Sequence, residues 1–340
     1  MWDIIKRLKF ICKYPFHKFR DAIRYVKVSN ELKILIQEIK TQYPNAVFFL
    51  QMANLGEVYV SCAYLKYLKS IEKDIIVFIL EEQKYTKQLI NIFPHISQTY
   101  FISHRANDLI RNDKSFAEKF KIQSLDIYEH EFNNNKPGSM VEAFRVLLNV
   151  QNKLPCNLTS STEDDLSKVH SIFIKTSCKI EKTVILTPEA RSFEYPLLND
   201  EFWIVLADRI VENGYDVVFN SNKNFAKYSS VFLSIRETIL LAKLCGNVIG
   251  ARSGLLDVLA GETNVFIQAI YPKNNDVFRS RFEHLKRFKF PENITTIEKL
   301  QIFYSLNKIR DDGKIKEIIL ESQTKEDLIK DILYTLNTQS

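Results

Sequence analysis

Short runs of consecutive apolar residues are the feature that most restricts how this chain can fold. The runs AVFFL (Ala46–Leu50), IIVFIL (Ile75–Leu80) and TVILT (Thr183–Thr187) have no polar residue between their apolar ones. A strand with one face in water alternates apolar and polar residues, so these runs predict strands buried on both faces, as in a parallel sheet covered by helices. The same pattern predicts further strands over Thr99–Ile102, Asp216–Phe219, Asn247–Gly250 and Val265–Ala269.

The predicted strands form two series, and amphipathic helices follow the strands in both. These helices are expected near Val58–Ser70, Gln83–Phe93, Asp200–Asn213, Ile235–Cys245 and Gly254–Gly261, with a last one near Lys325–Leu336. The alternation predicts an α/β fold with two Rossmann-like, doubly wound domains facing a cleft. The expected division is a basic amphipathic segment over 1–30, a first domain over 31–150, a polar linker over 151–165, a second domain over 166–323 and a C-terminal helix over 324–340 that packs across the domains.

Composition and missing motifs disfavour several classes of protein. The 340 residues include 24 Phe and 15 Tyr, too much apolar surface for a disordered chain. The five cysteines lack a C-x-x-C pair and the six histidines lack ligand spacing, so we expect neither a disulfide framework nor a metal site. There is no G-x-G-x-x-G, G-x-x-x-x-G-K-[ST], G-x-S-x-G or D-x-D motif. Ordinary dinucleotide enzymes, P-loop ATPases, serine hydrolases and transferases with an aspartate-held metal are therefore disfavoured.

The positive charge of the chain is concentrated at its N-terminal end. Residues 1–27 carry eight Lys or Arg against two Asp, a balance equal to the net charge of +6 of the whole chain. Apolar residues at helical spacing, including Trp2 and Phe16, accompany this charge. Such a helix can bind an anionic membrane surface, or it can pack on its own domain with its charges in water. The neutral remainder has no basic-aromatic pattern, so no nucleic acid is expected as a partner.

The turn after the first predicted strand holds candidate functional residues. It passes through Asn54, Leu55 and Gly56 to Glu57, and Gly56 is the only glycine in the first 137 residues. A glycine at a turn permits a positive φ or the close approach of a ligand. Glu57 falls in the first turn of the next helix, where it either faces the cleft or only interacts with the helix dipole.

Four of the eight glycines lie within 16 residues, in the segment CGNVIGARSGLLDVLAG. Arg252 and Ser253 follow a strand here, and Gly254 begins a helix. Amides at the start of that helix and the guanidinium of Arg252 predict an anion site suited to phosphate. Asp257 either accepts hydrogen bonds from sugar hydroxyls or pairs with Arg252. Tight packing of the helix on the strand is the alternative explanation for the glycines.

Two further turns of the second series follow strands and complete the expected cleft. Glu189 and Arg191 follow Thr183–Thr187, and Asn220 and Ser221 follow the next strand. The carboxyl ends of parallel strands share one edge of a sheet, so these side chains are expected near the glycine-rich turn. The pair Ser234 and Glu237, by contrast, has the spacing of a capping box and is interpreted as structural.

At these residues the chain resembles the bacterial GT-B glycosyltransferases of the heptosyltransferase type, glycosyltransferase family 9. The segment NLGEVYVSCAYLKYLKS resembles the family's Gly-Asp turn and helix, with Glu57 in place of the aspartate. The resemblance implies that Glu57 is the base that deprotonates the acceptor, with Asn54, Leu55 and Gly56 on the acceptor side. The family's Asp-Ser/Thr-Gly-x-x-His signature corresponds to RSGLLD, residues 252–257, which keeps Ser-Gly and changes both flanking polar positions. Arg191 stands in for the lysine that the family carries before a Trp-Pro pair.

The resemblance implies a metal-independent, inverting hexosyl- or heptosyltransferase with no cofactor. It would move a sugar from a nucleotide-diphosphate donor to a hydroxyl of a glycan or lipid-linked precursor of lipopolysaccharide or capsule. Residues 1–27 would hold this cytoplasmic enzyme at the inner face of the cell membrane. The alternatives are a pyruvyl transferase or nucleotide-sugar epimerase on the same scaffold, or an inactive scaffold of a glycan-assembly complex. The donor is expected to contact Arg252, Ser253, Gly254, Asp257, Arg191, Glu189, Asn220 and Ser221.

Overall fold

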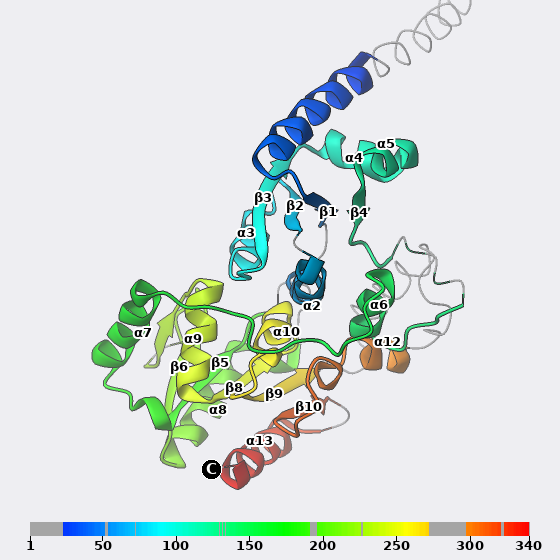
Figure 1. Cartoon of the computed structure of the whole chain (residues 1–340). Coiled ribbons are helices and arrows are strands. Elements are labelled where there is room, and N and C mark those ends of the chain that lie inside the picture. The colour runs from blue at the N-terminus through cyan, green and yellow to red at the C-terminus, as the bar shows by residue number, and fades with distance from the viewer. Residues whose placement is uncertain are drawn as a thin grey trace, which may run out of the picture.

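The computed structural model describes residues 23–51, 54–71, 73–128, 130, 132, 134–190, 196–225, 227–271, 297–320 and 323–339. Its strands form two parallel sheets, one from each half of the chain (Figure 1). The α/β class predicted from the apolar runs is therefore confirmed. The first sheet has the order β3-β2-β1-β4, with β1 (Ala46–Leu50), β2 (Asp74–Leu80), β3 (Ile96–Ile102) and β4 (Ile122–Ser124).

The second sheet has the strand order of a Rossmann fold. From β5 the chain winds outward through β6 and β7, then returns to the other side of β5 and winds outward through β8, β9 and β10. All of its neighbouring strands are parallel. Its strands are β5 (Thr183–Thr187), β6 (Asp216–Asn220), β7 (Ser229–Val231), β8 (Asn247–Ala251), β9 (Phe266–Tyr271) and β10 (Ile315–Ile319).

Helices cover both faces of the first sheet, because successive apolar residues of a strand point to opposite sides. Phe48 and Leu50 of β1 face a helix over residues 23–42 together with α4 and α5, whereas Phe49 faces α2, α3 and α6. The labelled helices are α2 (Leu55–Leu65), α3 (Lys84–Ile90), α4 (His104–Asn112), α5 (Lys114–Phe120) and α6 (Met140–Leu147).

The second sheet is covered in the same way. Ile185 of β5 faces α7, α9 and α10, whereas Val184 and Leu186 face α8 and α13. These helices are α7 (Glu163–Thr176), α8 (Asp200–Glu212), α9 (Ile235–Cys245), α10 (Gly254–Ala260) and α13 (Lys325–Gln339), and α12 (Ile297–Phe303) precedes β10. The capping box predicted for α9 is confirmed, since Ser234 Oγ accepts from the Glu237 amide and Glu237 accepts from the Ser234 amide.

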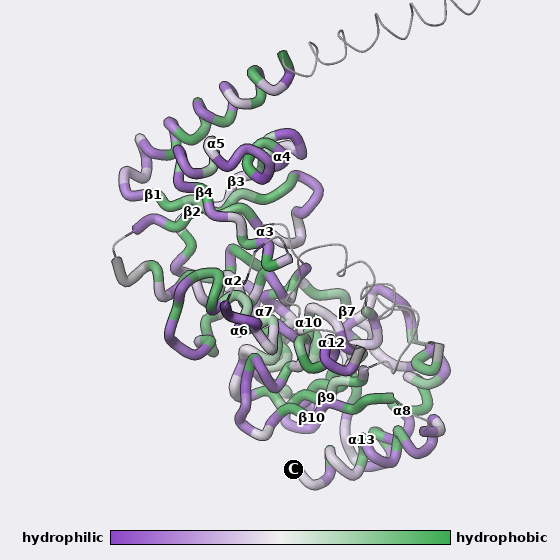
Figure 2. The backbone as a smooth tube through the Cα atoms, turned by 90° about the vertical axis from the view of Figure 1, so that its right-hand side faces the viewer, coloured by the Kyte–Doolittle hydropathy of each residue, from purple (hydrophilic) through white to green (hydrophobic). Residues whose placement is uncertain are grey.

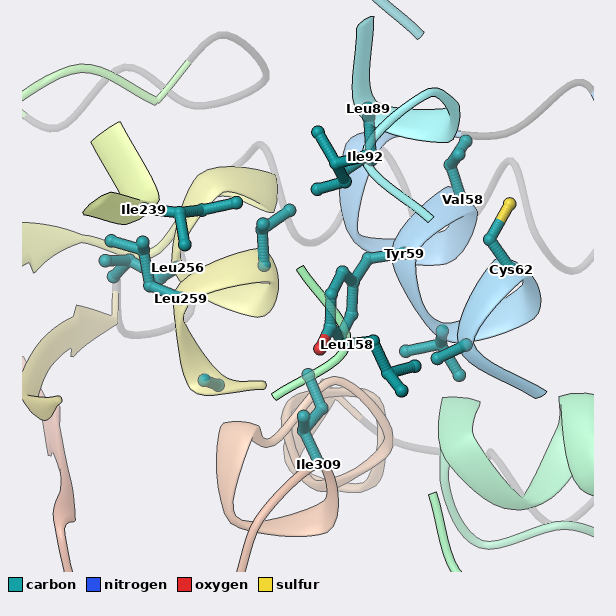
Figure 3. Close-up of a cluster of buried hydrophobic side chains, with 14 of the residues drawn as sticks. Val58, Tyr59, Cys62, Leu89, Ile92, Leu158, Ile239, Leu256, Leu259 and Ile309 are labelled. Carbon is teal, nitrogen blue, oxygen red and sulfur yellow. The ribbon is translucent and has the colours of Figure 1, made fainter. Parts of the chain in front are cut away.

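One apolar cluster joins the two halves of the molecule. Tyr59 of α2 lies beside Leu158, in one cluster with Leu256 and Leu259 of α10 (Figure 3). The hydrophobic colour in Figure 2 follows the strands inside both halves. The two sheets are thus joined by a buried contact between α2 and α10, at the base of the cleft described below.

The structure corrects three details of the predicted division. The boundary at residue 30 falls inside the helix over 23–42, whose Leu32, Ile36 and Ile39 are buried on the first sheet. The end of the predicted linker lies in α7, because Thr162 and Asp165 form a capping box that starts this helix. The C-terminal helix α13 packs beside α8 on the outer face of the second sheet instead of across the domains. Residues 1–22 of the basic segment lie outside the described residues.

Candidate functional site

A cleft of about 1750 Å³ lies where the two sheets face each other. In doubly wound sheets, ligands bind beyond the carboxyl ends of the strands, where the strand order reverses. Those points lie between β1 and β4 in the first sheet and between β5 and β8 in the second. The cleft is lined by the turns after three of these strands and the turn after β6: Asn54, Leu55, Gly56, Glu57, Glu189, Asn220, Arg252, Ser253, Gly254 and Asp257. The structure thus brings most of the predicted site residues together.

One side-chain hydrogen bond links the turns after β5 and β6, and another links the end of β6 to α9. Ser221 Oγ donates to Glu189 Oε1 at 2.7 Å, and Asn220 Nδ2 donates to Thr238 Oγ1 at 3.3 Å. Ser221 is only 3% exposed. The buried Ser221 therefore holds the Glu189 carboxylate in position, and Glu189 and Asn220 line the cleft. Arg191, predicted as a second cation here, lies outside the described residues.

Arg252 forms a buried ion pair with Asp257. Its Nη1 lies 3.0 Å from Asp257 Oδ2 and its Nη2 lies 2.6 Å from Oδ1, and both side chains are about 95% buried or more. The guanidinium also donates to the backbone oxygens of Ser253 (2.7 Å) and Tyr304 (3.0 Å). Of the two roles left open for Asp257, the structure shows the pairing. Burial raises the pKa of Asp257 to about 6, although the Arg252 guanidinium lowers it.

Close packing accounts for the glycines of both turns. A Cβ on Gly56 would lie 1.8 Å from Asp257 Oδ2, and one on Gly254 would lie 3.0 Å from the Gly56 nitrogen. A Cβ on Gly261 would lie 1.6 Å from the Tyr59 hydroxyl, and one on Gly250 would lie 1.9 Å from Thr187 Oγ1. The glycines thus let α2 approach α10 and β8 approach β5. The packing explanation holds for these positions, and a phosphate cradle is not needed to account for them.

Glu57 is a buried carboxylate at the centre of a polar cluster. Its Oε2 accepts from the Asn54 amide at 3.0 Å and from Asn54 Nδ2 at 3.3 Å, which closes the first turn of α2. Its Oε1 accepts a hydrogen bond from the Tyr128 hydroxyl, and the Tyr304 hydroxyl lies 3.5 Å from the same oxygen. Glu57 is 2% exposed but contributes to the cleft wall. It thus faces the cleft and also caps its helix.

Sequence reasoning missed both tyrosines. Tyr128 follows β4, a strand of three residues that is too short to show periodicity, and Tyr304 follows α12. They lie 71 and 247 residues from Glu57 along the chain. No local sequence pattern connects residues so far apart. The one signal that could have pointed to them is that each follows an element that ends near the predicted cleft.

The cleft wall carries more acidic than basic groups among the described residues. Asp200 and Glu201 join the three carboxylates named above, and Lys223 joins Arg252. Lys223 pairs with Asp200 at 3.0 Å. Two hydroxyl oxygens of the wall, Thr187 Oγ1 and Ser253 Oγ, are buried without a hydrogen-bond partner in the structure. Such orphaned groups are expected to bond to a ligand or water.

The described residues offer neither a metal cluster nor a membrane-spanning helix. Within them, no cluster of three or more His, Cys, Asp or Glu side chains is placed to hold a metal ion. Among the helices that the structure describes, none combines the length and apolar character needed to cross a bilayer.

Comparison with solved structures identifies the class of fold. The chain is similar to an ADP-heptose lipopolysaccharide heptosyltransferase II from E. coli, with a TM-score of 0.56 and 12% identity over 86% of this chain and 99% of that one. It is also similar to a glycosyltransferase of family 9 from Veillonella parvula, with a TM-score of 0.55 and 14% identity over 87% and 98%. A third similar structure is an E. coli heptosyltransferase with ADP, with a TM-score of 0.52 and 10% identity over 87% and 100%.

The chain therefore has the GT-B fold of these transferases over most of its length. No family model matches the sequence, and no curated protein matches it either. At this low identity the likeness concerns the fold alone.

Proposed function

We propose that this chain is a glycosyltransferase that moves a sugar from a nucleoside-diphosphate donor to a hydroxyl of a precursor of lipopolysaccharide or capsule. One observation carries the proposal: the cleft lies at the switch points of both sheets, with the carboxylate of Glu57 on one side and the turns after β5, β6 and β8 on the other. The similar transferases, described with ADP-heptose and ADP, support a nucleotide sugar as the donor.

The donor is assigned to the second sheet. Its diphosphate would lie against Ser253 and the backbone amides that begin α10, where the orphaned Ser253 hydroxyl can donate to a phosphate oxygen. Glu189 and Asn220 would bond to hydroxyls of the donor, and Arg191 would add positive charge. Such preorganised donors can stabilise the leaving diphosphate without a metal ion. Arg252 has a positioning role here, since its ion pair with Asp257 holds the turn in place.

Glu57 is assigned as the base that takes the proton of the acceptor hydroxyl. It contributes to the same cleft wall as the proposed donor turn at Ser253, where it can meet an acceptor hydroxyl, and the transfer is proposed to invert the sugar. General-base catalysis of this kind contributes about 10²–10⁴-fold to a rate. The acceptor would approach along Asn54, Leu55 and Gly56.

The basic N-terminal segment is assigned to the anionic inner face of the cell membrane. In the helix over 23–42, Ile23 and Val26 are more than half exposed beside the basic residues Arg24 and Lys27. Exposed apolar and basic residues on one helix suit binding to anionic lipid. In Figure 1 the start of this helix projects beyond the first sheet, on which its later residues Leu32, Ile36 and Ile39 are buried.

The test replaces Glu57 with glutamine. Glu57→Gln should bind nucleoside diphosphate like the wild type but lose about 10²-fold or more of its turnover, measured as release of nucleoside diphosphate from a sugar nucleotide. Glu142→Gln is the matched control, because Glu142 also caps a helix start, at α6, by accepting from the Gly138 amide. Unchanged turnover in Glu57→Gln would refute the assignment. Consumption of phosphoenolpyruvate, or a change in the donor's sugar without release of nucleoside diphosphate, would indicate the other enzymes on this scaffold.

A further inference from the structure

Two tyrosine hydroxyls connect the cleft to Glu57. The Tyr128 and Tyr304 oxygens lie 2.5 Å apart, and the Tyr128 hydroxyl donates to Glu57 Oε1. A tyrosine has one hydroxyl hydrogen, so Tyr304 is the donor within the pair. Tyr304 comes from the second half of the chain, whereas Tyr128 and Glu57 come from the first. The hydrogen-bonded series Tyr304–Tyr128–Glu57 therefore crosses between the two halves.

Both oxygens of Glu57 already accept hydrogen bonds. Oε2 is held by the backbone amide and the side-chain amide of Asn54, and Oε1 is held by Tyr128. Glu57 is also only 2% exposed, so an acceptor hydroxyl in the cleft has little direct access to either oxygen, and its proton can instead pass through one of these donors. The Asn54 nitrogens donate but cannot accept a proton, whereas a tyrosine hydroxyl does both. Tyr304, 9% exposed, contributes to the cleft wall, so its oxygen can meet an acceptor hydroxyl there.

We propose that the acceptor proton reaches Glu57 through Tyr304 and Tyr128. This inference rests on the proposed glycosyl transfer. The acceptor hydroxyl gives its proton to the Tyr304 oxygen, Tyr304 gives its own to Tyr128, and Tyr128 gives its own to Glu57. The acceptor oxygen forms the new bond to the anomeric carbon. The bond from that carbon to the donor phosphate oxygen breaks, and its electron pair leaves with the nucleoside diphosphate.

The position of Tyr304 is held from the donor side of the cleft. Its backbone oxygen accepts from Arg252 Nη2 at 3.0 Å, and the Tyr271 hydroxyl lies 3.4 Å from the same oxygen. Arg252 belongs to the turn proposed for the diphosphate and is paired with Asp257. The residue that meets the acceptor is thus hydrogen-bonded to the turn that would meet the donor.

The experiment measures turnover of the Phe variants. ADP-heptose, UDP-glucose and GDP-mannose serve as probes with water as the acceptor, and the rate is followed in mixtures of H₂O and D₂O. Tyr304→Phe and Tyr128→Phe should each lower kcat by about 100-fold, with the KM of the donor unchanged. Because the two hydroxyls act in series, the double variant should lose no more than either single one. A plot of the wild-type rate against the D₂O fraction should be curved, as expected when several protons move together. The same plot for the Phe variants should not be curved.

Tyr228→Phe is the matched control. Tyr228 also donates to a carboxylate, that of Asp208, but outside the residues of the cleft wall, so its loss should leave kcat and the D₂O dependence unchanged. Wild-type kcat in both Phe variants, with turnover lost in Glu57→Gln, would overturn the relay and leave Glu57 as a direct base. Wild-type turnover in Glu57→Gln would overturn the base and the relay together.

Discussion

At the scale of single residues, the absence of a side chain at Gly56 keeps the Arg252–Asp257 pair intact. Asp257 Oδ2 occupies the space that a Cβ at position 56 would need. Asp257 cannot move away easily, because it is buried and bound by two guanidinium hydrogen bonds. An unpaired buried charge is costly, so the neighbours of such a pair are tightly restricted.

Gly56→Ala is therefore expected to destabilise the protein. The added methyl group forces Asp257 from Arg252, and overpacking of this kind costs about 1–3 kcal/mol. The measurement is the free energy of unfolding in urea. Gly138→Ala is the control, because a Cβ there would meet nothing closer than 3.7 Å. Equal stability of Gly56→Ala and the wild type would show that Asp257 does not pack against Gly56 as closely as described.

The sequence predicted the residues of the cleft better than their partners. Arg252 and Asp257 are five residues apart, so their pairing was one of two expected outcomes, and it changes the expected role of Arg252 from a phosphate ligand to a support. Sequence could not predict that Tyr304 bonds to Arg252 through its backbone oxygen. Such contacts depend on how two halves of a chain meet, which local patterns do not encode.

At the scale of elements, strands buried on both faces were the best predicted. The strands Ala46–Leu50 and Thr183–Thr187 have the predicted bounds. All of their residues are apolar except the threonines at the two ends of the second strand, so the run of apolar residues marks where each strand begins and ends. The pattern did not predict β4 and β7, which have three residues each, or β10, in which Lys316 and Glu317 interrupt the apolar run. Edge strands of this kind are less buried, so their sequences are less restricted.

The α2 helix also makes a prediction about pH. Cys62 on α2 is fully buried, and burial raises the pKa of its thiol from 9.0 to about 12. The unfolded thiol loses its proton at lower pH than the folded one, so the stabilisation is complete below pH 9.0 and is lost as the pH rises toward 12. This thiol alone should lower the free energy of unfolding by about 1.4 kcal/mol per pH unit in that window. Cys62→Ala, unfolded in urea across the same window, should show a smaller slope, and an unchanged slope would contradict the assignment.

At the scale of the whole molecule, one of the three apolar clusters in the described part of the chain is built from both halves and joins the two sheets. The cluster around Tyr59 contains side chains of both halves (Figure 3), and three glycine contacts between α2 and α10 leave no room for a layer of water. Two domains facing a cleft were predicted from sequence, and this arrangement is confirmed. The strand pattern predicts each sheet, but it contains nothing about the packing of one sheet's helices on the other's.

The shared cluster predicts that both halves unfold together. Calorimetry should show one transition whose calorimetric enthalpy equals its van't Hoff enthalpy, which is the criterion for two-state unfolding. Tyr59→Ala, which empties the centre of the contact, should lower the melting temperature of the whole transition. Two resolved transitions in the wild-type protein would show that the halves are thermodynamically independent.

The most direct test of the account is whether the cleft binds a nucleoside diphosphate at Ser253. Melting temperatures would be measured with ADP, UDP, GDP and dTDP for the wild type, Ser253→Asp and Ser253→Asn. Asp and Asn both suit the N-cap position of α10, where Ser253 makes no side-chain capping bond, and they differ by one negative charge. The account predicts that one diphosphate, at about 100 times its Kd, stabilises the wild type by about 2.7 kcal/mol, and that Ser253→Asp loses this effect through repulsion while Ser253→Asn keeps most of it. No shift with any diphosphate, or an equal shift in Ser253→Asp, would contradict the assignment of this cleft to a nucleotide sugar.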